Sequence, residues 1–143
     1  MSLFLDTGVI VAYLNPRDAH HDDAVGIIAA AIRGDLGDVV TSDYVLDEVV
    51  TLTLSRTRRA DAALRVGELM LGSGPEGRFI DLAYVTSQTF LRSWALFRRF
   101  ISRGLSFTDC TSVELMRRLR MSDIASFDSD FDGIVSRRWT APA

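Results

Sequence analysis

The chain has 143 residues, 48% of them hydrophobic and 24% charged, and a formal net charge of −3. This composition is typical of an ordinary globular protein, and the length favours one domain, residues 1–143, with a buried core. The single cysteine, Cys110, excludes an intramolecular disulfide. No apolar run has the roughly 18 to 20 residues of a membrane span, and no basic residue precedes the first apolar run as in a secretory signal. We therefore expect a cytoplasmic protein without membrane contact.

All 16 basic residues are arginine. The lack of lysine excludes Schiff-base chemistry and Walker-type phosphate loops. The charge is uneven, because residues 1–54 carry a net −7 and residues 55–143 a net +4. An acidic protein is a poor general binder of nucleic acid, yet its arginine-rich half can still hold phosphates locally.

The sequence predicts short apolar strands that alternate with helices. The predicted strands are 2–5, 38–41, 78–83 and 123–127. The predicted helices are 8–14, 19–33, 43–55, 59–71, 88–103 and 107–120, with one short turn of helix at 129–134. This alternation predicts an α/β fold with a central parallel sheet, in which the reactive cleft lies beyond the carboxyl ends of the strands.

Two aspartates follow predicted strands and so point toward this cleft. Asp6 interrupts the apolar run LFLDTGVIVAYL, and Asp128 follows the strand in IASFDSDF. Either residue is also explained as the N-cap of the helix that follows it. Burial of an unpaired carboxylate is costly, however, and such groups are usually capped, paired or bound to a metal.

Two further acids belong to predicted helices. Glu48 shares the apolar stripe of its helix with Val45, Val49 and Leu52, so it faces inward and needs a partner. That partner is either an ion in a shared site or an arginine in a buried salt bridge. Asp109 opens its helix, where a capping box with Ser106 is the structural alternative.

These four carboxylates would repel one another in a single cleft unless a cation lay between them. Oxygen ligands without histidine or cysteine suit Mg²⁺ or Mn²⁺ rather than zinc. Such an ion activates water and stabilises charge on a phosphodiester.

The segments FLDTGVIVAYLN, TSDYVLDEVVTL, SFTDCTSVELM and IASFDSDF resemble, in order and spacing, the acidic motifs of PIN-domain ribonucleases. The likeness extends over essentially the whole chain and is closest to the small proteins of the VapC toxin type. It implies a PIN-like three-layer fold, with a short central parallel sheet in the order 3-2-1-4-5 flanked by helices. Only four strands are clear from the residues, so we expect a fifth near 136–141.

The resemblance also implies an endoribonuclease dependent on Mg²⁺ or Mn²⁺, with an antitoxin protein that blocks it. We also expect a homodimer. Carried over by position, the acidic quartet is Asp6, Glu48, Asp109 and Asp128, with Asp6 and Asp109 as direct metal ligands. Thr7 is expected beside the site, and Ser112 as a support of Asp109. Asp130 and Asp132 compete with Asp128 for the fourth position.

The sequence also allows other functions and other roles for particular residues. A PIN fold without catalysis would act as a binding module for RNA or protein. A haloacid-dehalogenase-like phosphatase would need a second aspartate at position 8, which is Gly8. His20 and His21 are expected to be solvated at a helix start rather than metal ligands. The aromatic stripe Phe90, Trp94, Phe97 and Ile101 is expected to be core or, if exposed, a dimer surface.

Overall fold

The computed structural model describes all of residues 1–143. The strands are β1 (Ser2–Leu5), β2 (Asp38–Ser42), β3 (Asp81–Ala83), β4 (Asp123–Ala125) and β5 (Ser136–Arg138). The α-helices are α1 (Thr7–Leu14), α2 (His21–Ile32), α3 (Asp43–Thr57), α4 (Ala60–Leu71), α5 (Ser87–Phe100) and α6 (Phe107–Leu119). Two short 3-10 helices complete the chain, η1 (Ile101–Arg103) and η2 (Ser129–Phe131).

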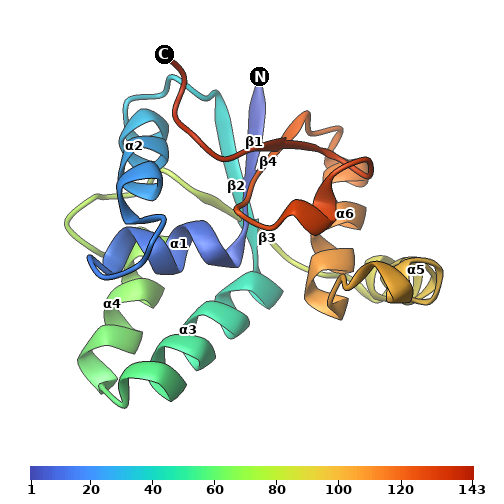
Figure 1. Cartoon of the computed structure of the whole chain (residues 1–143), viewed down its shortest axis with the longest axis horizontal. Helices are drawn as coiled ribbons and strands as arrows, with labels where there is room; N and C mark the ends of the chain where they lie inside the picture. Colours follow the sequence, from blue (N-terminus) through green and yellow to red (C-terminus); the bar gives the residue numbers. More distant parts are fainter.

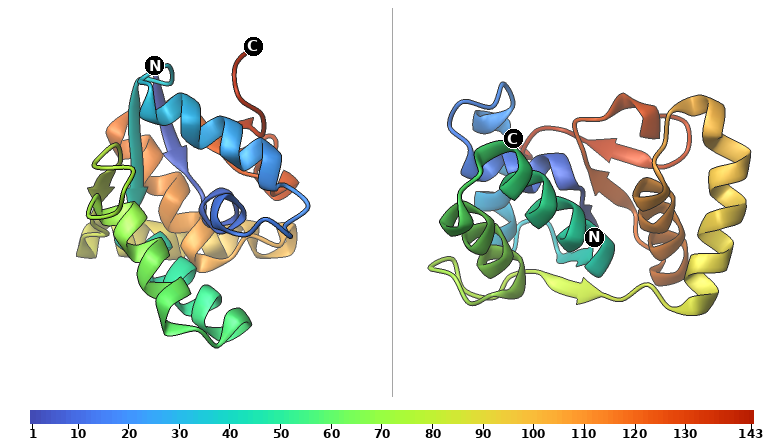
Figure 2. Two further views of the ribbon diagram at one scale, coloured as in Figure 1. Left: turned by 90° about the vertical axis from the view of Figure 1, so that its left-hand side faces the viewer. Right: turned by 90° about the horizontal axis from the view of Figure 1, so that it is seen from below.

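The five strands form one parallel sheet in the order β3-β2-β1-β4-β5. Helices α1 and α2 lie on one side of the sheet, and α6, backed by α5, lies on the other (Figure 1). Helices α3 and α4 pack against each other beyond the carboxyl ends of the strands (Figures 1 and 2). The predicted α/β class, the expected strand order and the fifth strand are all confirmed.

The central strand β1 explains why the chain begins with an unbroken apolar run. Leu3, Phe4 and Leu5 are consecutive and all buried, because both faces of this parallel sheet are covered by helices. They belong to a single core of 28 buried hydrophobic residues. The strand therefore delivers the next residue, Asp6, to the carboxyl edge of the sheet.

Several predicted boundaries differ from the structure. Strand β3 begins at Asp81 rather than at 78, and β4 ends at Ala125 rather than at 127. The expected helix over 129–134 is only the single turn η2. The early end of β4 matters for the site, because Ser126 and the residues after it leave the strand and turn across the carboxyl edge.

The last turn of the predicted helix over 88–103 tightens into η1, which ends at Gly104 as expected. Gly104 has φ +86°, and a Cβ there would lie 2.9 Å from Asp130 Oδ2, so glycine permits both the backbone turn and this close approach. None of the helices combines the length and apolar character needed to cross a membrane.

Candidate active site

Asp6 occupies the N-cap position of α1, but its side chain makes no capping hydrogen bond. Instead Ser126 Oγ donates a hydrogen bond of 2.7 Å to Asp6 Oδ2. The aspartate is only 6% exposed. The capping interpretation of Asp6 is therefore wrong for its carboxylate, which turns toward the edge of the sheet.

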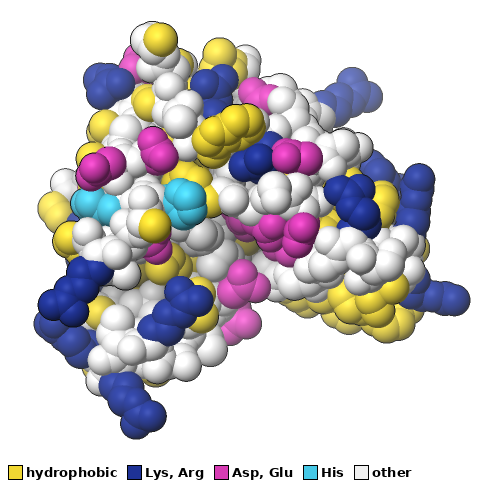
Figure 3. All heavy atoms as spheres, viewed as in Figure 1, with side chains coloured by type: hydrophobic (Ala, Val, Ile, Leu, Met, Phe, Trp, Pro, Cys, Tyr) yellow, Lys and Arg dark blue, Asp and Glu magenta, His cyan; other side chains and the backbone are white.

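The predicted quartet comes together at this edge. One open depression is lined by Asp6, Thr7, Gly8, Glu48, Ser106, Asp109, Phe127 and Asp128. The acids come from the end of β1, the second turn of α3, the first turn of α6 and the segment after β4. Acidic side chains gather at the centre of the corresponding face (Figure 3). Of the three candidates for the fourth position, Asp128 lines the depression, whereas Asp130 and Asp132 are not among the lining residues.

Two of these acids are also helix caps. Ser106 and Asp109 form a reciprocal capping box, with Asp109 N donating to Ser106 Oγ at 3.0 Å and Ser106 N to Asp109 Oδ2 at 2.9 Å. Asp128 Oδ1 accepts from Asp130 N at 2.9 Å at the start of η2. Both capping interpretations are thus confirmed, and the same hydrogen bonds orient the two carboxylates that line the depression.

Glu48 has no arginine partner. It is half-buried beside the buried Val45 and Val49, as its place on the apolar stripe predicts. No arginine lies within ion-pair distance of its carboxylate. The alternative prediction of a buried salt bridge is therefore wrong, and Glu48 faces the other carboxylates.

The electrostatics of the depression favour protonated carboxyl groups. Burial, together with the nearby Asp109 and Glu48, raises the pKa of Asp6 to about 7, although the Ser126 hydrogen bond opposes the shift. Burial also raises the pKa of Asp109, against the lowering effect of its hydrogen bonds with Ser106. A site of this kind favours a proton or another cation among its oxygens.

The donor set fits a hard divalent cation. Every polar side chain that lines the depression offers oxygen, and Thr7 Oγ1 is buried there without a hydrogen-bond partner. No group of three or more acidic, histidine or cysteine side chains lies close enough together to hold a metal ion in this arrangement. The carboxylates would therefore have to turn inward to share an ion. The oxygen chemistry and the orphaned Thr7 hydroxyl match the preference of Mg²⁺ and Mn²⁺.

The two histidines lie outside this donor set. His21 Nδ1 forms a hydrogen bond of 2.7 Å with the Ala12 carbonyl oxygen. The His20 ring stacks on Phe127. Neither histidine is therefore among the residues that line the acidic depression.

The sequence did not predict the contact of Ser126 with Asp6, and the role expected for Ser112 is wrong. Ser126, which holds Asp6, was detectable only as a small polar residue directly after an apolar strand. Ser112 does not support Asp109, because its hydroxyl donates to the Thr108 carbonyl at 3.3 Å. This intrahelical bond is a common alternative for serine within a helix.

Comparison with known proteins gives the family. Residues 3–135 match the model of the PIN domain. The chain is 28% identical to "VapC ribonuclease" of Archaeoglobus fulgidus, over 92% of this chain and 80% of that protein. It is 30% identical to "23S rRNA-specific endonuclease VapC20" of Mycobacterium tuberculosis, over 90% of this chain and 91% of that one.

Solved structures agree with this result. The crystal structure of Mycobacterium tuberculosis VapC20, described as a sarcin-ricin loop cleaving toxin, superposes with a TM-score of 0.77 at 30% identity, over 90% of this chain and 92% of that one. VapBC2 from Rickettsia felis, bound to a promoter DNA fragment, shares the fold with a TM-score of 0.68 at 12% identity, over 96% and 98% of the two chains. Family model, relatives and sheet order agree: the chain belongs to the PIN-domain family and is a VapC-type member of it.

Proposed function

We propose that this protein is a metal-dependent endoribonuclease that hydrolyses RNA phosphodiester bonds and acts as the toxin of a toxin–antitoxin pair. The observation that carries the proposal is the convergence of Asp6, Glu48, Asp109 and Asp128 in one open depression without a cationic partner. The names of the relatives, a VapC ribonuclease and a 23S rRNA-specific endonuclease, support the same reaction class.

Asp6 and Asp109 would hold the Mg²⁺ or Mn²⁺ ion, with Glu48 and Asp128 completing its acidic surroundings. A bound ion supplies Lewis-acid chemistry, lowering the pKa of water and stabilising negative charge on a phosphodiester.

The chain's own contribution is to fix these oxygens in place. The hydrogen bond from Ser126 Oγ holds Asp6 Oδ2. The capping box fixes Asp109 at the N-terminus of α6, where the helix dipole favours an anionic group. Ser126 Oγ also accepts from Asp128 N at 3.0 Å, so one hydroxyl links two of the four acids.

The proposal is tested by RNA cleavage with the purified chain. Structured RNAs are incubated with Mg²⁺, with Mn²⁺ and with a chelator, for the wild type and for Asp109→Asn. The matched control is Asp47→Asn, an exposed acid on α3 whose carboxylate accepts only from Thr51 at 3.5 Å. We expect metal-dependent cleavage that Asp109→Asn removes and Asp47→Asn preserves. RNA binding without cleavage would instead identify a non-catalytic PIN module.

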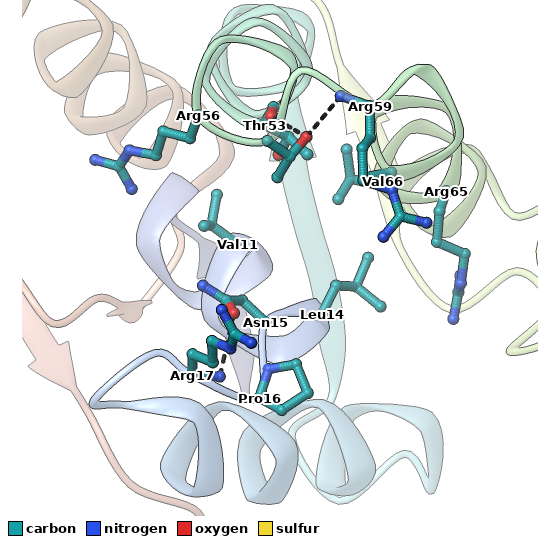
Figure 4. A pocket seen from close by; sticks show the side chains of 12 residues that line it. Val11, Leu14, Asn15, Pro16, Arg17, Thr53, Arg56, Arg59, Arg65 and Val66 are labelled. Carbon is teal, nitrogen blue, oxygen red and sulfur yellow. Dashed lines mark hydrogen bonds between the residues drawn. The ribbon is translucent and has the colours of Figure 1, made fainter.

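We further propose that an antitoxin segment binds in a partly apolar groove of this chain. This groove of about 600 Å³ lies between α1, α3 and α4 (Figure 4). Apolar side chains line it, namely Val11, Leu14, Ala62 and Val66. Four arginines and no acid also line it, namely Arg17, Arg56, Arg59 and Arg65.

Two of these arginines lack a carboxylate partner. Arg59 pairs with Asp61 at 2.6 Å, and Arg65 pairs with Glu76. Arg17 and Arg56 have no such pair. A groove with an apolar lining and unpaired guanidinium groups suits an amphipathic segment with acidic side chains.

Charge reversal tests this assignment. Arg17→Glu combined with Arg56→Glu should abolish co-purification with the proposed antitoxin. Arg78→Glu, an exposed arginine before β3, is the matched control and should retain the partner. Undiminished capture by the double variant would place the antitoxin elsewhere.

The outer face of α5 is the proposed homodimer surface. Most of the predicted aromatic stripe is exposed, with Phe90 44%, Trp94 51% and Ile101 61% accessible, while Thr89 and Ser93 face the core. Aromatic side chains and arginine without acidic residues are typical of protein interfaces. Light scattering should report a dimer for the wild type and a monomer for Trp94→Glu; an unchanged mass would remove α5 from the interface.

A further inference from the structure

Beside the acidic depression, the rings of His20 and Phe127 stack with centroids 4.3 Å apart and planes inclined by 10°. We propose that this stacked pair is a base-binding wall, which takes an unpaired RNA base next to the phosphodiester that is cleaved. The inference rests on the ribonuclease function proposed above and assigns substrate-binding residues to it.

Phe127 is in place for this role. It lies between Ser126, which holds Asp6, and Asp128, which is the fourth acid, and it is the one aromatic residue that lines the depression. Its ring approaches the start of α1 closely, since a Cβ on Gly8 would lie 3.9 Å from Phe127 Cδ2. The ring is therefore fixed next to the metal-site carboxylates while remaining partly exposed.

His20 extends this aromatic surface into solvent. Its backbone is anchored, because His20 N donates to Asp18 Oδ1 at 2.9 Å and its carbonyl accepts from Ala24 N at 2.9 Å. The ring is exposed and is held by the stack on Phe127. Histidine side chains are visible on the face that carries the central acidic cluster (Figure 3).

The charge of the depression explains why such a wall is useful. Four carboxylates repel the phosphates of RNA, so part of the binding free energy has to come from contacts that do not depend on phosphate charge. Base stacking on an aromatic ring supplies it, because every base has a π-face. Sequence-specific RNA recognition mostly uses unpaired bases in loops, which are free to stack in this way.

A purely structural role makes a different prediction. If the stack only pins the segment before α2 to the segment after β4, its loss should lower the melting temperature without changing RNA affinity. The two roles are therefore separable when binding and stability are measured on the same variants.

The probe is an RNA stem–loop in which 2-aminopurine replaces one loop base at a time. Binding is followed by fluorescence in an Asp6→Asn background, where cleavage does not interfere. The variants are His20→Ala, His20→Tyr and Phe127→Leu. The leucine in Phe127→Leu keeps the apolar packing and removes the aromatic face. Tyr84→Leu, at an exposed aromatic residue after β3 that does not line the depression, is the matched control.

We expect one loop position to be quenched on binding. His20→Ala and Phe127→Leu should remove this quenching and weaken affinity by about tenfold or more. His20→Tyr should restore both, and Tyr84→Leu should change neither. Unchanged quenching and affinity in His20→Ala would overturn the proposal, as would weaker affinity without any change at a particular base. Failure of the ribonuclease function itself would appear separately, as absence of cleavage by the otherwise wild-type chain.

Discussion

Two buried carboxylates in this molecule have opposite surroundings. Glu114, in the middle of α6, is 2% exposed and lies 3.7 Å from Arg117 Nη1 and 3.9 Å from Arg92 Nη1. Asp6 is similarly buried, but its neighbours are a serine hydroxyl and two further acids.

The difference is between a buried charge that arginines compensate and one that no cation compensates. A buried carboxylate is tolerated when cations or hydrogen bonds compensate its lost hydration. The fold provides arginines to Glu114 and none to the Asp6 depression, although the chain contains 16 of them. An uncompensated acidic cluster at the carboxyl edge of the sheet is the pattern expected where a cation has to bind.

The largest expected effect is on cleavage. Asp6→Asn should lower the rate of RNA hydrolysis at least a hundredfold, because it removes a charge from the proposed metal site and such ions contribute several kcal/mol to catalysis. Glu114→Gln, which also neutralises a buried acid, should leave the rate for folded protein unchanged. The cleavage rates of both variants are measured by gel on one RNA. Equal losses of rate would contradict the distinction between Asp6 and Glu114.

Glu48→Gln should follow Asp6→Asn rather than Glu114→Gln. Since Glu48 has no arginine partner, its neutralisation leaves no stranded cation and should not lower the melting temperature. Cleavage should fall about tenfold or more if the charge belongs to the ion-binding set. Cleavage and melting temperature are measured on one preparation. A destabilised protein that still cuts RNA at the normal rate would end this assignment.

The metal-free protein should lose stability as the pH rises. Asp6 has a pKa of about 7 in the folded state against a reference of 3.8. Between these values the folded state therefore binds a proton that the unfolded state lacks, so the free energy of unfolding falls with rising pH. The loss should reach a few kcal/mol by neutral pH.

The control for this pH dependence is Asp6→Asn, which cannot ionise at this position. Denaturation curves at pH 4, 5, 6 and 7 in the presence of chelator give the difference between the two proteins. Their free energies of unfolding should diverge steadily, with the variant becoming relatively more stable at neutral pH. Parallel curves would show that Asp6 titrates normally.

The smallest expected effect is the stability cost of Glu114→Gln. Its two arginines are largely exposed, so each ion pair contributes only some tenths of a kcal/mol, and the loss should be about 1 kcal/mol. Chemical denaturation measures it. The sign is opposite to that expected for Asp6→Asn at neutral pH, and a stabilised Glu114→Gln would show that burial outweighs the arginines.

The sheet was predictable because its signals are local. Consecutive apolar residues such as Leu3, Phe4 and Leu5 indicate a strand covered on both faces, and Ser106 with Asp109 forms a recognisable capping box. Strand ends were less predictable, since the point where β4 stops depends on pairing with β1 and β5 rather than on its own residues. The fifth strand lacks an apolar run and was expected only from the resemblance.

The acidic site was predictable as a set and not in its details. Asp6 and Glu48 each interrupt an apolar pattern, which is visible in the sequence. The bond between Ser126 and Asp6 joins residues 120 positions apart, and no local pattern reports such a contact. Glu114 was overlooked for the same reason, because its burial depends on how α5 packs against α6.

The most direct test of the central claim is calorimetry of Mn²⁺ binding in buffers with different ionisation enthalpies. If the ion replaces a proton on Asp6, whose pKa is about 7, wild-type protein should release about half a proton per ion at pH 7, more at pH 6 and almost none at pH 8.5. Asp6→Asn should bind Mn²⁺ weakly and lose this proton release. Tight Mn²⁺ binding to Asp6→Asn, with the same proton release as the wild type, would contradict the account.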